Sequence, residues 1–439
     1  MDDAVYQYQH ARSPKELLFQ FTRCMVHFAV DDAQVKFCTR LQGKESWFLP
    51  FNKGYKDGAG NPPNPDGLMT DYLWKQVLTK DMLSRIIENY ATLVEEKDEE
   101  TGKTRYKQIF PRYHQLTAVE SLLADVKKNG VGNRYLIQHS AGSGKSNSIA
   151  WLAHQLTGLE DAQGNLLVDS VIVVTDRVVL DKQIRDTIRQ FAQTRNIIAW
   201  AEHSGDLRKA IEDGRRIIIT TIGKFPYVLP EIGEDHKDRH FDIIIDEAHS
   251  SQNGKTAGTM NMTLSAIMSD PDMDNEDKIN AMCEGKKLLT NASYFAFTAT
   301  PKNKTLETFG TAYEDAGVIK HRPFHVYTMK QAIQEGFILD VLKYYTPIDS
   351  YYRLKKTVED DPMFDKKKAQ KKLRAFVENQ TFTIAQKADM MVSHFHEQVI
   401  AKGKIGGQAR AMIITSSIER CIEYYHAVNK CLANRHSPY

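Results

Sequence analysis

One glycine-rich segment carries residue types suited to binding a nucleotide. The run YLIQHSAGSGKS, residues 135–146, places an apolar stretch typical of a strand directly before a loop that ends in Gly-Lys-Ser. Gly142 and Gly144 allow the backbone to approach a phosphate closely, and the N-terminus of a following helix adds a favourable dipole. We expect the ammonium of Lys145 to contact the β- and γ-phosphates of ATP and the hydroxyl of Ser146 to bind Mg²⁺.

The first position of this loop departs from the general pattern. That pattern begins with glycine, whereas this chain has His139. A histidine is acceptable there if its backbone does not need a conformation that only glycine adopts. Ser143, between the two glycines, completes the predicted phosphate-binding loop. The alternative is an ordinary Gly/Ser-rich turn before a buried helix, and the residues of this segment leave it open.

A second motif, FDIIIDEAH at residues 241–249, places acidic residues at the end of another apolar stretch. Asp246 is expected to hold Mg²⁺, directly or through water, and Glu247 to polarise the attacking water. His249 is interpreted as a residue that couples the site to the rest of the protein, or as a structural histidine. The acidic pair has its own alternative, as the N-cap of a helix. The two motifs in this order predict the core of a nucleoside triphosphatase.

The elements around the motifs predict an α/β fold. Short apolar runs rich in Val and Ile alternate with helical patterns, which is typical of a parallel sheet buried on both faces. In such sheets ligands bind beyond the carboxyl ends of the strands, where both motifs stand. The predicted strands are Arg134–Gln138, Ser170–Thr175, Arg216–Thr221, Phe241–Asp246 and Tyr294–Thr298.

The flanking blocks are less regular. In the first block we predict helices at Pro14–Val30 and Asp71–Leu93 and strands at Gln34–Leu41 and Ser46–Phe51. The charged stretch Glu95–Lys103 is the best candidate for a linker. Near the C-terminus we predict a strand at Ala411–Thr415 and a helix at Ile418–Leu432.

Length and composition narrow the class of protein. The 439 residues suggest two or three domains, and 58 basic against 56 acidic side chains exclude a uniformly basic nucleic-acid binder. The N-terminal segment lacks the apolar stretch of a signal peptide, and no apolar run is long enough to span a membrane. Five scattered cysteines indicate reduced thiols in the cytoplasm. A metal site made of Cys24, His27 and Cys38 is a weaker alternative.

Taken together, these motifs resemble superfamily 2 helicases and translocases. More narrowly, the chain resembles the restriction (motor, R) subunit of type I restriction-modification enzymes. The segments that carry the resemblance, besides GSGKS and DEAH, are FLPFNKG (48–54), GNPPN (60–64), FPRYHQ (110–115), VVTDRVVLDKQ (173–183), DEAHSSQ (246–252), FTATPK (297–302) and VYTMKQAIQEGFILDVLKYY (326–345).

The resemblance implies an arrangement of domains. Residues 1–95 would be the C-terminal part of an α/β nuclease-type domain, followed by a linker at 96–103. Residues 104–325 would form a first RecA-like P-loop domain, and residues 326–439 the incomplete beginning of a second one. No carboxylate–lysine set of a nuclease occurs in the first block, and no arginine-rich motif of a second motor domain follows. The chain is therefore expected to be truncated at both ends and to hydrolyse ATP weakly by itself.

The resemblance also implies roles for individual residues. Gln115 would read the adenine edge, or would simply be a glutamine at a helix start. Asp176 and Arg177 would belong to the segment that links nucleotide and DNA. Threonines at strand ends would couple hydrolysis to movement along DNA, although each could instead satisfy local backbone groups. These threonines are Thr220, Thr221, Thr298 and Thr300.

The implied activity is that of an ATP-dependent double-stranded DNA translocase, with cleavage after translocation in the intact restriction complex. Its cofactors would be ATP and Mg²⁺, and its partners DNA and the methyltransferase and specificity subunits. The basic run Lys366–Arg374 could contact phosphates, but a solvated helix face is the commoner explanation. Two other functions stay open, a strand-separating helicase and a catalytically silent ATP-binding module.

Overall fold

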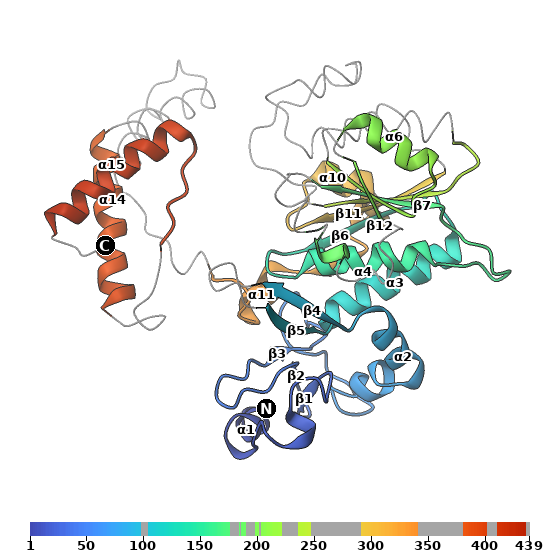
Figure 1. The fold of residues 1–439 in the computed structure, drawn as a ribbon, viewed down its shortest axis with the longest axis horizontal. Helices are drawn as coiled ribbons and strands as arrows, with labels where there is room; N and C mark the ends of the chain where they lie inside the picture. The colour runs from blue at the N-terminus through green and yellow to red at the C-terminus, as the bar shows by residue number, and fades with distance from the viewer. Residues whose placement is uncertain are drawn as a thin grey trace. The chain divides into compact units, whose positions relative to one another are not determined.

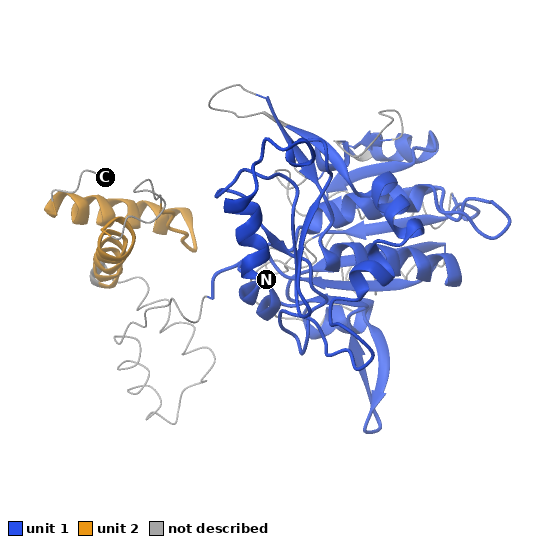
Figure 2. Cartoon of the chain, turned by 90° about the horizontal axis from the view of Figure 1, so that it is seen from below, with its two compact units in different colours: residues 1–340 blue, residues 341–439 orange. Residues whose placement is uncertain are grey.

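The computed structural model describes residues 1–97, 104–175, 184, 186–189, 198–201, 203–221, 236–246, 291–340, 381–401 and 411–435. The chain divides into two compact units, residues 1–340 and 341–439, which Figure 2 colours blue and orange. Each unit is described by itself. Within the described residues, no helix combines the length and the apolar character that crossing a bilayer requires.

A seven-stranded sheet forms the centre of the first unit. Its strand order is β14-β6-β11-β10-β7-β9-β8, and every neighbouring pair is parallel. All five predicted strands are present, so the predicted α/β class with a parallel sheet is confirmed. The strands are β6 (Arg134–His139), β7 (Ser170–Thr175), β8 (Ile198–Trp200), β9 (Ile217–Thr221), β10 (Phe241–Ile245), β11 (Ala292–Thr298) and β14 (His325–Tyr327).

Helices cover both faces of this sheet, which explains why β7 and β10 are mostly apolar and are buried at every position. Helices α3 (Tyr113–Asn129) and α4 (Lys145–Thr157) lie on one face, and α6 (Ser204–Glu212) lies on the other (Figure 1). Along β10, Ile244 belongs to the core cluster that contains Trp151 of α4, whereas Phe241 belongs to the cluster that contains Leu207 of α6. Each such buried aliphatic side chain contributes about 1.5–3 kcal/mol to the free energy of unfolding.

In the first block (residues 1–95) one predicted helix is wrong and the other is only partly present. Residues 14–30 form only a short 3₁₀ helix, η2 (Leu17–Phe19), followed by strand β1 (His27–Val30). Leu17 and Leu18 are exposed, and Thr22 has a φ of +75°, so the apolar spacing there does not make a helical face. Strand β1 pairs with β2 (Val35–Cys38), which pairs with β3 (Leu49–Pro50), so the two predicted strands exist in shorter form.

The predicted helix at 71–93 is divided. A π-helical turn, η3 (Leu73–Val77), comes before α2 (Lys80–Asn89), and the Thr79 side chain caps α2 by accepting a hydrogen bond from the Met82 amide. Residues after Asn89 form β4 (Thr92–Lys97), which pairs antiparallel with β5 (Thr104–Ile109). The first residues of the predicted linker, 95–97, therefore belong to a hairpin. Residues 98–103 lie outside the described part of the chain.

The remaining elements of the first unit are short. The chain begins with α1 (Asp2–Tyr6) and the π-helical turn η1 (Gln7–Ala11). After β11 come α10 (Asn303–Phe309), an exposed hairpin of β12 (Thr311–Asp315) and β13 (Val318–Arg322), then β14 and α11 (Met329–Gln334).

The second unit contains α14 (Thr381–His394), the π-helical segment η6 (Phe395–Ile400) and α15 (Ile418–Asn434). The predicted helix at 418–432 is confirmed, and Ser417 caps it by accepting a hydrogen bond from the Arg420 amide. The predicted strand at 411–415 is wrong, because these residues have no regular structure. An apolar run becomes a strand only when a neighbouring strand accepts its backbone hydrogen bonds.

Candidate nucleotide-binding site

The two sequence motifs meet at one edge of the sheet. The nucleotide loop, Ser140–Gly144, leaves the carboxyl end of β6, and Asp246 follows the carboxyl end of β10. Only β11 separates these strands, and all three are parallel. Since neighbouring strands lie about 4.8 Å apart, the ends of β6 and β10 are about 10 Å from each other. A triphosphate with its metal ion fits this span.

The loop has the backbone conformation that its glycines predict. Gly142 has a φ of +72° and Gly144 a φ of +77°, which side chains with a Cβ rarely adopt. His139 is not among the described non-glycine residues with a positive φ, and it closes β6 as an ordinary strand residue. The histidine at the first loop position therefore needs no glycine-like backbone. Helix α4 starts at Lys145, so its first N–H groups, which have no intrahelical acceptor, lie beside the loop.

Replacing Gly144 with alanine is expected to weaken ATP binding about tenfold and to destabilise the fold by about 1–3 kcal/mol. A Cβ at this position would lie 2.5 Å from Gln115 Nε2, in addition to the strained φ. Gly164→Ala is the matched control, because Gly164 has a φ of +83° but no atom within 4 Å of the added Cβ. Calorimetric ATP titration and thermal unfolding of both variants separate the contact from the strain. Equal ATP affinities for the two variants would contradict the expectation.

Three side chains from the start of α3 hold the carbonyl groups of the loop. Arg112 Nη2 donates to Gly142 O at 2.7 Å, and Gln115 Nε2 donates to Gly144 O at 2.9 Å. Between them, His114 Nε2 lies 3.0 Å from Ser143 O. Burial lowers the pKa of His114 well below its usual value, so the ring is neutral and this nitrogen carries its proton. With three successive carbonyls bonded to the protein, the loop is preorganised to turn amide groups toward an anion.

Gln115 is therefore bonded to the protein at both ends of its side-chain amide. Its Oε1 accepts a hydrogen bond from the Arg112 amide at 2.9 Å, while its Nε2 is bonded to the loop. The side chain is 3% exposed, which limits what an adenine could contact. The second Nε2 hydrogen is the group still available for the adenine role that the sequence predicts, and that role stays a prediction.

Sequence reasoning missed the segment that follows β14. Phe337 stacks on the Arg112 guanidinium at 4.0 Å, and a Cβ on Gly142 would lie 3.4 Å from both Phe337 and Ile338. Glu335 accepts hydrogen bonds from Tyr327 Oη at 2.7 Å and Gln331 Nε2 at 2.9 Å, and burial raises its pKa. The run VYTMKQAIQEGFILD was visible in the sequence, but nothing in its spacing indicates that it packs on a loop almost two hundred residues earlier.

The segment that follows β14 also joins the first block (residues 1–95) to the candidate site. Gln334 Oε1 on α11 accepts a hydrogen bond from the Ala59 amide at 2.7 Å, and Thr328 Oγ1 donates to Asp57 O at 2.5 Å. A Cβ on Gly58 would lie 2.4 Å from Gln334 Oε1, so a side chain at this position would displace the end of Gln334. The FNKGYKDGAGN region therefore lies against the helix that precedes Phe337.

Several buried polar atoms fit a phosphate and a metal ion. Ser143 Oγ and Arg112 Nη1 are buried and have no hydrogen-bond partner among the described residues. Ser146 is the second residue of α4, and Asp246 is 6% exposed at the end of β10. A hydroxyl and a carboxylate, together with phosphate oxygens and water, are the ligands that Mg²⁺ prefers.

The other predicted site residues divide into two groups. Thr298 ends β11, between the two motifs, and Thr300 follows it; Thr220 and Thr221 end β9, two strands beyond β10. These threonines share the carboxyl edge with the nucleotide loop. Asp176, Arg177, Glu247, His249 and the basic run 366–374 lie outside the described residues.

Cys24, His27 and Cys38, which are described, do not form a metal site, since no candidate group of three ligands occurs among the residues described.

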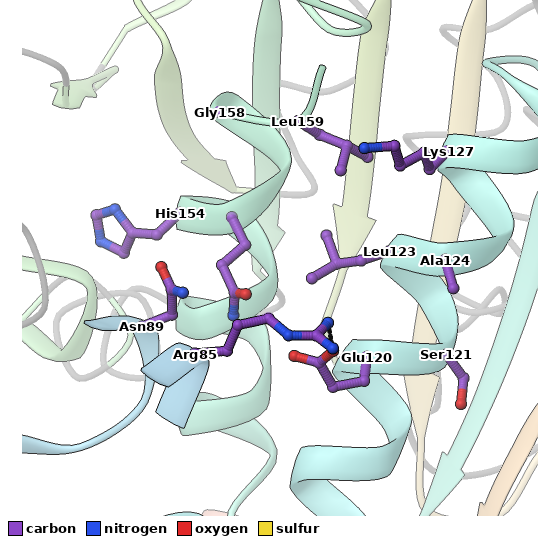
Figure 3. Close-up of a pocket in the computed structure, with 11 residues that line it drawn as sticks. Arg85, Asn89, Glu120, Ser121, Leu123, Ala124, Lys127, His154, Gly158 and Leu159 are labelled. Atoms are coloured by element: carbon purple, nitrogen blue, oxygen red, sulfur yellow. Dashed lines mark hydrogen bonds and ion pairs between the residues drawn. The ribbon is translucent and has the colours of Figure 1, made fainter. Parts of the chain in front are cut away.

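A separate cavity of about 690 Å³ lies between α2, α3 and α4 (Figure 3). Arg85 and Glu120 form an ion pair on its wall, and Lys127, His154 and Leu159 also line it. Arg85 belongs to α2, and the residues from α3 and α4 lie beyond the first turns of those helices, which adjoin the nucleotide loop. No residue of the loop lines the cavity, so it is distinct from the candidate site.

The sequence is similar to those of known proteins. The sequence model of the SWI2/SNF2 ATPase family matches residues 114–375. The type I restriction enzyme SauMSSORF170P endonuclease subunit of Staphylococcus aureus (strain MSSA476) is 27% identical over 235 residues, which are 52% of this chain and 21% of that protein. The C-terminal part of the type I restriction enzyme MpnIIP endonuclease of Mycoplasma pneumoniae is 31% identical over 159 residues, which are 33% of this chain and 73% of that protein.

Two solved structures are also similar. An HsdR fragment of a type I restriction enzyme from Vibrio vulnificus YJ016 aligns with a TM-score of 0.41 and 14% identity, over 93% of this chain and 68% of that one. The UvsW helicase of bacteriophage T4 aligns with a TM-score of 0.30 and 13% identity, over 53% of this chain and 66% of that one. The match to the Staphylococcus aureus relative spans about a fifth (21%) of that protein's length.

The matched family segment includes the nucleotide loop, α4 and Asp246. The chain therefore belongs to the SWI2/SNF2 ATPase family and is related to the endonuclease (HsdR) subunits of type I restriction enzymes.

Proposed function

We propose that this chain is the ATP-hydrolysing motor part of a type I restriction endonuclease, and that it moves along double-stranded DNA. One observation carries the proposal. A member of the SWI2/SNF2 ATPase family places a preorganised nucleotide loop and the carboxylate Asp246 at the same edge of one parallel sheet. That arrangement is the minimum required to hold the phosphates and the metal ion of ATP.

In this proposal the chain's residues bind and orient the nucleotide. Lys145 neutralises charge on the β- and γ-phosphates, while Ser146 and Asp246 hold Mg²⁺. Glu247, next to Asp246 in sequence, accepts a proton from the attacking water and fixes its orientation. Gln115 contacts the adenine with its remaining amide hydrogen. When bound, ATP would supply the bond that is broken, and the metal ion would neutralise charge that develops on the γ-phosphate.

In this proposal the threonines at the strand ends couple the bound nucleotide to the DNA. Thr298 and Thr300 are near Asp246 along the edge, and Thr220 and Thr221 are farther out. Hydroxyl groups at such positions suit contacts to DNA phosphates, which fix position without reading sequence. Asp176, Arg177 and His249 would complete this coupling set.

The proposal includes the organisation of the whole enzyme. Residues 1–95 would belong to a nuclease-type domain, residues 104–325 to the first RecA-like domain, and residues 326–439 to the beginning of a second. In such motors, arginines of the second domain stabilise charge on the γ-phosphate. Methyltransferase and specificity subunits would direct the motor to its DNA.

A triplex-displacement assay tests this function. The full natural subunit that carries this sequence, with its methyltransferase and specificity subunits, is supplied with ATP and a duplex bearing a third strand downstream of the recognition site. A translocase removes the third strand and leaves the duplex paired. Separation of the duplex would instead show a strand-separating helicase, and ATP binding without either reaction would show a silent binding module. Either of these results would overturn the proposal.

A further inference from the structure

The histidine at the first position of the nucleotide loop belongs to a chain of hydrogen bonds under the loop. His139 Nε2 lies 2.9 Å from His325 Nδ1, and His325 Nε2 lies 3.1 Å from Thr117 Oγ1. The three residues come from the end of β6, from β14 and from α3, so the chain joins the start of the loop to two elements beside it. His139 is completely buried.

The number of protons that each group carries indicates which atom donates in each of these hydrogen bonds. The Thr117 hydroxyl has one proton, which it donates to Tyr113 O at 3.0 Å, so it accepts from His325 Nε2–H. The other nitrogen of a neutral His325 then has no proton and accepts from His139 Nε2–H. His139 Nδ1 is left as a bare acceptor, and it has no partner among the described residues. A buried acceptor without a partner is less unfavourable than a buried donor without one, which favours this direction.

The rings stay neutral, as this count requires. Burial lowers the pKa of His139 well below its usual value and lowers that of His325 to about 4. Two neutral imidazoles can each donate one hydrogen bond and accept one, so the chain is consistent from end to end.

We propose that His139 and His325 are positioning residues for the nucleotide loop. The bond from His139 Nε2–H to His325 Nδ1 fixes the start of the loop against β14. The pairing of β14 with β6 ends at the register Tyr327–His139, and one further backbone bond, from the Ser140 amide to Tyr327 O at 3.0 Å, extends it into the loop. Beyond that point the loop has a local backbone bond, from the Ser143 amide to Ser140 O at 3.2 Å, and its bonds to Arg112, His114 and Gln115 are made by their side chains.

The same aromatic cluster reaches the middle of the loop. His114 packs edge-to-face on His139 with ring centroids 5.3 Å apart and stacks on Tyr327 at 3.8 Å. Its Nε2 is bonded to Ser143 O. The loop is thus held at its first residue and at Ser143 by rings that contact one another. Glycine, which the general pattern has at position 139, would leave this cluster with a cavity and remove the bond to β14. This role rests on the proposed ATP binding and adds to it the reason for the histidine.

Paired substitutions at His325 test the proposal. Glutamine can accept a hydrogen bond from His139 and donate one to Thr117, whereas leucine of similar size can do neither. We expect His325→Leu to raise the Kd of a fluorescent ATP analogue about tenfold and His325→Gln to stay within about threefold of wild type. Val326→Ala is the control, because Val326 lies on the same strand with its side chain 41% exposed. Thermal unfolding of each variant establishes that the binding measurement is made on folded protein.

Nitrogen-15 NMR of the histidine rings gives a readout that does not depend on nucleotide. At neutral pH we expect His139 with a protonated Nε2 and an unprotonated Nδ1. The opposite tautomer would overturn the direction of the chain, and unchanged ATP affinity in His325→Leu would overturn the positioning role.

If the proposed ATP binding itself is wrong, the same measurements would give a different set of results. In that case the wild-type chain would bind the analogue no more tightly than Lys145→Ala does, while the tautomers would still be measurable. The positioning role would then fall with ATP binding. Binding by wild type that is lost in Lys145→Ala but unaffected in His325→Leu would reject only the histidine proposal.

Discussion

Replacing Lys145 with alanine is expected to lower DNA-stimulated ATP turnover by about 100-fold or more and to weaken ATP binding as well. Lys145 is the first residue of α4, directly after the positive-φ Gly144, at the end of the helix where the loop amides and the helix dipole favour an anion. Its charge adds to theirs at the phosphates, where negative charge moves during phosphoryl transfer.

The measurement compares wild type and Lys145→Ala in the full natural subunit, with and without double-stranded DNA. Lys127→Ala is the matched control, because Lys127 lies near the other end of α3, at the separate cavity. It removes the same charge and should leave turnover unchanged. Equal hydrolysis by wild type and the Lys145 variant would show that the nucleotide site is assigned to the wrong loop.

Replacing Asp242 with asparagine is expected to stabilise the protein at pH 8 by about 2–4 kcal/mol. Asp242 is the second residue of β10 and is completely buried, and the Ser293 side chain on the neighbouring strand β11 offsets the effect of burial only in part. Burial raises the pKa of this carboxyl to about 7. At pH 8 the Asp242 carboxyl is therefore mostly charged in the folded protein. Keeping that charge buried lowers the free energy of unfolding.

The sign of the pH dependence follows from this shift. Because the pKa is higher in the folded state than the value of about 3.9 in the unfolded state, the folded state binds the proton more tightly. Stability from this group is complete below pH 4, falls as the pH rises from about 4 to about 7, and stays low above that. A difference of about three pKa units corresponds to about 4 kcal/mol, which sets the upper limit for the variant.

Urea unfolding at pH 5 and pH 8 measures the effect. Asp242→Asn should gain stability relative to wild type at pH 8 and much less at pH 5. Asp213→Asn is the control, since Asp213 is an exposed carboxylate just after α6. A gain of equal size at both pH values would mean that the charge of Asp242 is not the cause.

The parts of the fold that sequence analysis predicted are those where local pattern and burial agree. The runs at β7 and β10 are mostly apolar and are buried at every position, as expected of strands covered on both faces. Predictions failed where an apolar spacing had no partner. Leu17 and Leu18 have helical spacing but are exposed, and the run at 411–415 has no neighbouring strand among the described residues of its unit. Burial and pairing are properties of the folded chain, so spacing alone could not decide these cases.

For the candidate site, the sequence by itself determined the chemistry at the ends of β6 and β10. Gly142, Gly144 and Lys145 are recognisable because the phosphate loop is local and each of these residue types has a backbone or charge requirement. Only the tertiary structure decided what holds the loop. Arg112, His114 and Gln115 bind three successive carbonyls, and His325 and Phe337 reach the loop from almost two hundred residues away. Contacts between distant segments depend on strand order, and a single sequence carries no periodic signal for it.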